Sequence, residues 1–119
     1  MKRVDGKIQR RVRRKQHIRK KIKGSPTCPR MTVYRSNRKM YVQVIDDLSG
    51  STLASVSTME KEFRELGNNV ENAGKIGAEI GERLKKKNID KVVFDRNGYL
   101  FHGIVKAIAD GARKAGIRF

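Results

Sequence analysis

The sequence predicts an α/β fold: a basic N-terminal helical arm, then a small β-β-β-α-β-α domain with a mixed sheet and helices packed on one face. Charge is the first observation, because residues 1–30 hold 13 of the 29 Lys and Arg residues but only one acid. Residues 31–57 alternate in polarity over three short runs, which indicates strands. Residues 70–87 and 104–115 repeat apolar residues at spacings of three and four, which indicates helices. We therefore expect a basic arm and linker over residues 1–29 and a globular domain over residues 30–119.

The arm reads as a weak helix. Five aliphatic residues recur mostly every fourth position: Val4, Ile8, Val12, Ile18 and Ile22. The stripe is narrow and cations surround it, so we expect the helix to fray alone and to gain order on a polyanion. A solvated tail or a nuclear-localisation-like patch is the alternative, and the density of charge favours phosphate contact. Gly24–Pro29 contains both prolines of the chain and separates the arm from the domain.

The domain begins with three strands. We expect them at Met31–Arg35, Met40–Ile45 and Ser51–Ser57, joined by turns at Ser36–Lys39 and Asp46–Gly50. Connections this short predict an antiparallel meander.

The second strand predicts how the sheet is covered. Val42 and Val44 share one face, whereas Tyr41 and Gln43 share the other. One apolar and one mixed face indicate that helices cover a single side of the sheet.

Helices follow the meander. Thr58–Leu66 predicts a short helix, and Asn68-Asn69 precedes a longer one over Val70–Lys87. The apolar residues of the longer helix are Ala73, Ile76, Ile80 and Leu84. Its glycines, Gly74, Gly77 and Gly81, indicate close packing, which we expect to be against the sheet. They lack the G-x-G-x-x-G spacing of a nucleotide-binding loop and lie inside a helix.

The last elements are a strand, a loop and a helix. Lys91–Phe94 predicts a buried strand that runs parallel to a neighbour, because a helix precedes it. The loop Asp95–Gly103 follows, and we expect Asp95 to be a cap or an anchor for Arg96. The last helix, Ile104–Ala115, has four apolar residues on its buried face and Gly116 as its C-terminal cap. Those four residues are Val105, Ile108, Ala109 and Ala112.

The sequence argues against an enzyme. Cys28 and His17 lie in the linker and the arm, where nothing would hold them together as a nucleophile and base. One cysteine and two histidines give neither a disulfide framework nor a transition-metal site. The neighbouring carboxylates Asp46 and Asp47 lack partners from other elements. We expect no cofactor, no small-molecule substrate, no membrane span and no secretory signal.

The charge favours a polyanionic partner. The net charge is +17, and Lys and Arg side chains that neutralise phosphates release condensed counterions. Among the aromatic residues we expect Tyr34 and Phe94 in the core, whereas Tyr41 and Tyr99 are candidates for either packing or stacking on bases. The residues alone predict a protein that binds structured RNA. DNA or another polyanion is the alternative partner.

Three segments carry a family resemblance. They are Val33–Asp47, Thr52–Ser55 and Lys91–Gly103, and together with the length and the basic arm they cover essentially the whole chain. They resemble the family of bacterial large-subunit ribosomal protein eighteen, which binds 5S ribosomal RNA.

The resemblance implies a structural constituent of the cytoplasmic ribosome. Such proteins bind 5S rRNA, help attach it to 23S rRNA and help form the central protuberance, beside large-subunit ribosomal protein five and its neighbours. By resemblance, RNA lies near the arm, the turn after the first strand and the loop Asp95–His102. The candidate contacts are Arg3, Lys7, Arg10, Arg11, Arg13, Arg14, Lys15, Arg19, Lys20, Lys21, Arg30, Arg35, Ser36, Asn37, Arg38, Tyr41, Arg96, Tyr99 and His102.

Three positions depart from the family's common pattern. Asn97 stands where Gly is common, a mild change because Asn tolerates the left-handed region of backbone conformation. Phe101 replaces a common Tyr, and Ile104 replaces a common Arg, so we carry no RNA contact to that position. A nucleoid or regulatory protein that binds DNA through the arm remains the alternative.

Overall fold

A computed structural model describes residues 6–36, 39–60, 63, 67 and 69–119, except for the side chain of Lys7. Its elements are α1 (Gly6–Lys21), β1 (Arg30–Arg35), β2 (Met40–Asp46), β3 (Ser51–Ser57), α2 (Val70–Lys86), β4 (Val93–Asp95) and α3 (Ile104–Lys114). Of the short helix expected at residues 58–66, Thr58, Met59 and Glu60 form a turn, and most of the remainder lies outside the described residues.

The described strands form one mixed sheet in the order β3-β2-β1-β4. β2 pairs antiparallel with β1 and with β3, and β4 pairs parallel with β1. The predicted meander and the predicted parallel strand are both confirmed. β4 begins two residues later than predicted, because Lys91 and Val92 pair with Arg118 near the C-terminus instead of with β1.

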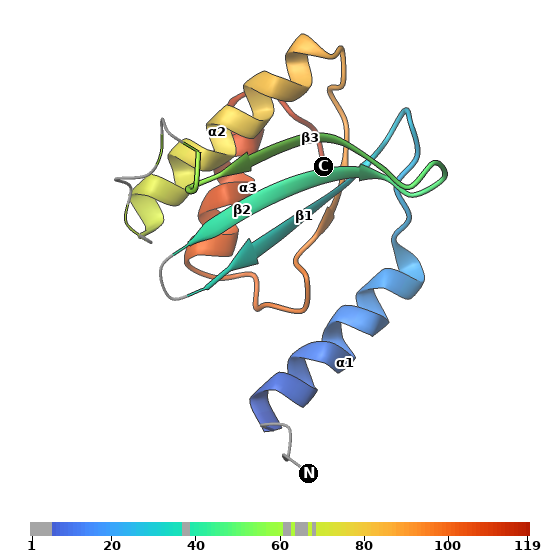
Figure 1. Ribbon diagram of the computed structural model, residues 1–119, viewed down its shortest axis with the longest axis vertical. Coiled ribbons are helices and arrows are strands. Elements are labelled where there is room, and N and C mark those ends of the chain that lie inside the picture. The colour runs from blue at the N-terminus through green and yellow to red at the C-terminus, as the bar shows by residue number, and fades with distance from the viewer. Residues whose placement is uncertain (1–5, 37–38, 61–62, 64–66, 68) are drawn as a thin grey trace.

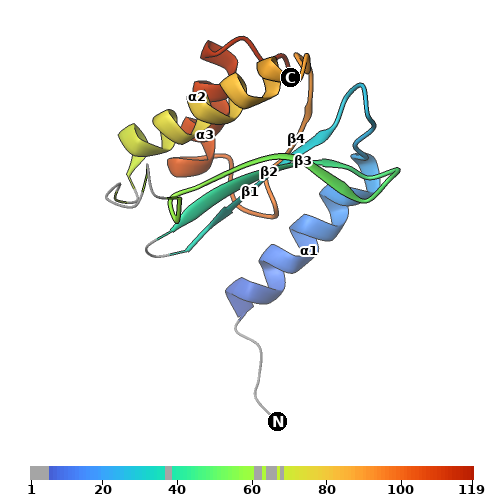
Figure 2. The same ribbon diagram turned by 45° about the horizontal axis from the view of Figure 1, so that its top comes forward.

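One face of the sheet carries the core. Met40, Val42 and Val44 of β2 are fully buried, whereas Tyr41 and Gln43 are half-buried on the opposite face. Figure 2 shows α2 and α3 together on one side of the sheet and α1 on the other. The alternation of β2 therefore predicts correctly which side the two C-terminal helices cover.

The predicted apolar stripes of both helices are confirmed. On α2, Ala73, Ile76, Ile80 and Leu84 are fully buried, and on α3 Val105, Ile108, Ala109 and Ala112 are at most 1% exposed. The side chain of Asn69 caps α2 by accepting a hydrogen bond from the backbone N–H of Asn72. Gly116 follows α3 with φ +106°, in the left-handed region predicted for its cap.

The glycines of α2 pack against α3 rather than against the sheet as expected. A Cβ on Gly77 would meet the carbonyl of Ile108, and one on Gly111 would meet the carbonyl of Gly74. A Cβ on Gly81 would lie 2.5 Å from that of Ala115. The missing side chains thus let the two helices approach closely, and sequence periodicity cannot say which neighbour fills such a stripe.

Candidate nucleic-acid interface

The helix α1 is the most strongly charged element of the described chain. Its sequence, GKIQRRVRRKQHIRKK, contains nine Lys and Arg residues and no acid. Four of these cations are exposed: Arg10, Arg13, Lys20 and Lys21. The predicted helix is confirmed, and Figure 1 shows it projecting from the domain near the loop that follows β4. Arg3 and the side chain of Lys7, both candidate contacts, lie outside the described residues.

The middle of α1 contacts the loop after β4. The Arg14 Nε donates a hydrogen bond of 2.9 Å to the carbonyl of Gly98, and the Arg11 guanidinium lies 4.6 Å from the centre of the Tyr99 ring. Gly98 has φ +77°, and a Cβ there would meet the backbone carbonyl of Arg11. Only glycine combines this conformation with so close an approach of helix and loop.

The next turn of α1 is held by a buried carboxylate. Arg19 donates from Nε to Asp95 Oδ2 at 3.1 Å and from an Nη to Asn97 Oδ1 at 3.2 Å. The Asp95 side chain is fully buried and also accepts a hydrogen bond of 2.9 Å from the backbone N–H of Asn97. Asn97 has φ +55°, in agreement with the tolerance expected of this residue. Asp95 therefore anchors Arg19 of the arm. Of the two roles predicted for Asp95, a cap or an anchor for Arg96, the second is wrong.

A second ion pair fixes the joint between arm and domain. Arg30 donates two hydrogen bonds of 3.0 Å to Asp47 and one of 2.8 Å to Asp95, and its side chain is 12% exposed. The hydrogen bonds from Arg30, followed by one from the backbone N–H of Gly24, hold the pKa of the Asp47 carboxyl below its ordinary value. The two carboxylates engage the Arg30 guanidinium, and its predicted RNA contact stays a prediction.

Lys15 lies within this cluster of cations. Its pKa is lowered from the ordinary value, first by burial and then by the positive charges of Arg19 and Arg11. An anion placed beside Lys15 would relieve that repulsion. Lys15 therefore lies among like charges on the side of α1 that faces the loop after β4.

The loop also reaches the turn after β1. The Tyr99 hydroxyl donates a hydrogen bond of 3.0 Å to the carbonyl of Arg35, and Arg96 donates one of 3.0 Å to the carbonyl of Tyr99. The side chains of Arg35 and Ser36 are exposed. Asn37 and Arg38 lie outside the described residues. The arm, the end of β1 and the loop after β4 therefore meet at Tyr99.

The sheet face opposite α2 and α3 carries two tyrosines. Tyr34 and Tyr41 are direct partners across β1 and β2, with ring centres 5.0 Å apart. Tyr34 is 38% exposed, so its predicted place in the core is wrong. The alternation of β1 buries Val33 and turns Tyr34 outward, a signal present in the sequence. Phe94 is half-buried and packs against the core, with its ring against Phe101 and Phe119.

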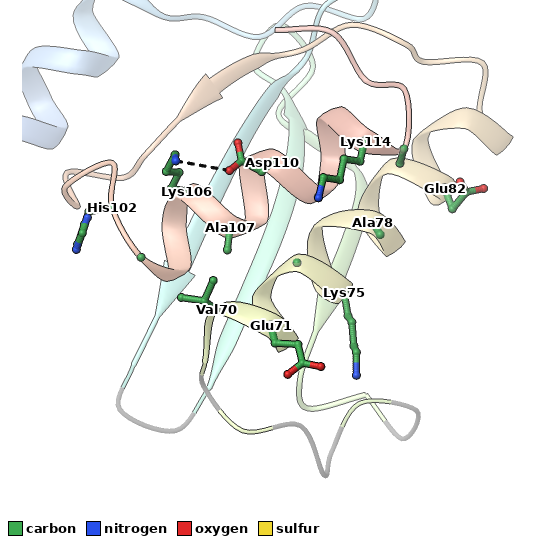
Figure 3. Close-up of a pocket in the computed structure, with 14 residues that line it drawn as sticks. Val70, Glu71, Lys75, Ala78, Glu82, His102, Lys106, Ala107, Asp110 and Lys114 are labelled. Atoms are coloured by element: carbon green, nitrogen blue, oxygen red, sulfur yellow. Dashed lines mark ion pairs between the residues drawn. The ribbon is translucent and has the colours of Figure 1, made fainter.

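His102 lies apart from this cluster. It is exposed and lines one end of a groove between α2 and α3, shown in Figure 3. Three lysines and three carboxylates line the same groove, with Lys106 and Asp110 forming an ion pair of 4.0 Å. This balance of charge contrasts with α1, so the groove is a poor surface for a polyanion.

The described residues offer no other chemical centre. Among them we find no cluster of three His, Cys, Asp or Glu side chains suited to a metal ion, and no helix long and apolar enough to span a membrane. Cys28 is half-buried in the joint and His17 is exposed on α1, with no hydrogen bond between them. The cationic surface around α1 is the candidate site.

Comparison with known proteins decides what kind of protein carries this surface. A family model described as ribosomal L18 of archaea, bacteria, mitochondria and chloroplast matches residues 5–119. This chain belongs to the ribosomal L18 family. The large ribosomal subunit protein uL18 of Treponema denticola is 63% identical over 118 residues, which cover 99% of this chain and 98% of the relative. The uL18 of Treponema pallidum is 58% identical over 119 residues, covering 100% and 99%, and that of Sorangium cellulosum is 53% identical over 116 residues, covering 95% and 98%.

Membership of the L18 family confirms the resemblance of the three sequence segments. The chain is a structural constituent of the large subunit of the cytoplasmic ribosome, and it is not an enzyme. Ribosomal RNA and ribosomal proteins are therefore its partners.

Proposed function

We propose that this L18 protein binds 5S rRNA and helps attach it to 23S rRNA in the central protuberance, beside large-subunit ribosomal protein five. One observation carries the proposal: α1, the loop after β4 and the turn after β1 form a single cationic surface joined at Tyr99. Family membership favours ribosomal RNA over DNA as the polyanion that this surface meets.

The cations divide into two roles. Arg10, Arg13, Lys20 and Lys21 are exposed on α1 and make the leading phosphate contacts, and Lys15 is a further contact on the side of α1 that carries Arg11 and Arg19. A second group orients the surface, because carboxylates, carbonyls or a ring already engage their guanidinium groups. This group consists of Arg11, Arg14, Arg19, Arg30 and Arg96.

Uncharged groups and the exposed turn supply recognition of RNA shape. Arg35, with the neighbouring Asn37 and Arg38, reaches phosphates, and Ser36 reaches a phosphate oxygen or a 2′-hydroxyl group. Tyr41 and Tyr99 border this turn from the sheet and from the loop. His102 makes its contact at the far end of the loop. Arg3 and Lys7, which precede Arg10 in the sequence, are further phosphate contacts in this proposal.

Matched charge removal tests the proposal. One variant changes Arg10, Arg13, Lys20 and Lys21 to Gln. A control variant changes four exposed lysines of α2 and α3 and their ends: Lys75, Lys86, Lys87 and Lys114. Both lose four positive charges, but only the first loses proposed phosphate contacts.

The readout is the slope of log affinity for 5S rRNA against log salt concentration. The arm variant should reduce the magnitude of that slope by about 3, at roughly 0.7–0.9 per lost contact, and the control should barely change it. Equal slopes in the two variants would show that α1 does not lie at the phosphates.

A further inference from the structure

The tyrosine pair on the open sheet face has a geometry suited to more than packing. Tyr34 and Tyr41 are cross-strand partners with rings 5.0 Å apart and tilted by 31°. Tyr41 is half-buried beneath its neighbour, while Tyr34 leaves 38% of its surface exposed. α2 and α3 cover the other face, so neither helix shields this pair (Figure 2).

The third tyrosine of the chain is already engaged. The Tyr99 ring lies under the Arg11 guanidinium, and its hydroxyl is bonded to the backbone of Arg35. Within the described part of the chain, the Tyr34 side chain has neither a guanidinium over its ring nor a hydrogen bond to its hydroxyl. The hydrogen bond from Tyr99 goes to the backbone of the next residue, Arg35. Tyr34 therefore offers, at the border of the cationic surface, a partly exposed ring whose described aromatic contact is with Tyr41.

An exposed cation lies beside Tyr34 at the end of β1. The side chain of Arg35 is exposed and makes no hydrogen bond to the described residues. Arg35 is the direct cross-strand partner of the buried Met40, so it leaves the strand toward the sheet face opposite to that of Tyr34. The ring of Tyr34, and not the guanidinium of Arg35, is therefore the group that this face offers to a base.

We propose that the Tyr34–Tyr41 pair is a stacking platform for one unpaired nucleotide of the bound RNA. The inference rests on the proposed function, since it needs an RNA on the adjoining cationic surface. Bases inside an A-form duplex are stacked on one another and do not present a face to a protein side chain. The RNA bound here therefore presents a bulged, looped or terminal base at this point.

A single tryptophan reports on stacking. The chain contains no Trp, so Tyr34→Trp places the only indole of the protein on the platform. We expect 5S rRNA to quench its emission strongly at saturation. A fully paired RNA duplex bound at low salt should leave the emission nearly unchanged.

Two further variants separate stacking from packing of the sheet. Tyr34→Phe keeps the ring and should keep the affinity of the parent for 5S rRNA. Tyr34→Val keeps a residue that favours strands but removes the ring, and should weaken 5S rRNA binding by roughly 5- to 100-fold. It should leave duplex binding unchanged. Circular dichroism checks that each variant retains the parent fold.

The outcomes distinguish this proposal from the proposed function. If 5S rRNA binds in preference to duplex but neither quenches the tryptophan nor depends on the ring at position 34, the platform is refuted and the function stands. If the parent protein shows no preference for 5S rRNA, the proposed function fails first.

Discussion

Gly98→Ala tests whether α1 is docked on the domain or merely attached to it. A Cβ at this position would meet the backbone carbonyl of Arg11 and would lie 3.0 Å from the Cβ of Lys15. A backbone carbonyl within a helix cannot move by itself. The substitution must therefore shift α1 away from the loop after β4.

The loss of stability has two parts. Alanine in the left-handed conformation of Gly98, φ +77°, costs about 1–2 kcal/mol. Undocking then forfeits the hydrogen bond from Arg14 and the contact of Arg11 with Tyr99, a cation–π interaction of about 0.5–1 kcal/mol at an exposed site. The Arg19–Asp95 pair adds about 1 kcal/mol, a small value because the Arg19 side chain is 37% exposed. With about 0.5–1.5 kcal/mol for the hydrogen bond from Arg14, we expect a total loss of about 3–5 kcal/mol.

Gly50→Ala is the matched control. Gly50 has φ +71°, and the position of its Cβ is open, so this variant suffers the conformational cost alone. Urea unfolding followed by circular dichroism measures the free energy of unfolding, and limited trypsin digestion measures exposure of the arm. Gly98→Ala should lose about 2 kcal/mol more than Gly50→Ala and should be cut faster within residues 6–21. Equal losses and equal cleavage rates would refute the docking of α1 on Gly98.

Two further predictions concern the turn and the joint. Arg35→Ala should weaken 5S rRNA binding by about 1–3 kcal/mol without changing the melting temperature, because its side chain is exposed. Arg96→Ala should weaken binding and, in addition, lower the melting temperature, because it loses a hydrogen bond to Tyr99 worth about 0.5–1.5 kcal/mol. Filter binding measures the affinity of both variants, and thermal melts measure their stability. Equal melting temperatures for the two variants would contradict the structural role of Arg96. Arg30 lowers the pKa of the Asp47 carboxyl. The stabilisation that this carboxylate gives to the fold is therefore complete above its ordinary pKa of 3.8, and it is lost as pH falls through the lower pKa of the folded protein. Asp47→Asn should therefore lower the free energy of unfolding at pH 7 and reduce its decline between about pH 5 and pH 2, and a decline as steep as that of the parent would count against the pairing.

Local patterns were sufficient to predict most of the fold. Ile76, Ile80 and Leu84 follow the helical repeat and are all fully buried, because a helix exposes the same face every three to four residues whatever it packs against. Val42 and Val44 likewise follow the two-residue repeat of a strand. The order of elements and the covered face of the sheet came from these repeats.

Long-range pairing accounts for what was missed. Asp95 and Arg19 are 76 positions apart, and no property of either residue names the other as its partner. The same limit applies to the glycines of α2, which pack on α3 although their spacing fits a sheet equally well. Tyr34 is a different case, because the alternation of β1, which is visible in the sequence, places it on the face opposite to the buried Val33.

Competition binding tests the central claim, recognition of one folded RNA rather than of charge. Labelled 5S rRNA on the parent protein is competed with duplex DNA and with unstructured heteropolymer RNA of equal nucleotide content, at low and at moderate salt. Phosphate contacts weaken as salt rises, whereas contacts that depend on RNA shape persist. We predict that 5S rRNA keeps a clear advantage at moderate salt. An advantage that disappears there, or duplex DNA that competes as well as 5S rRNA, would contradict the account and favour a protein that binds polyanions by charge alone.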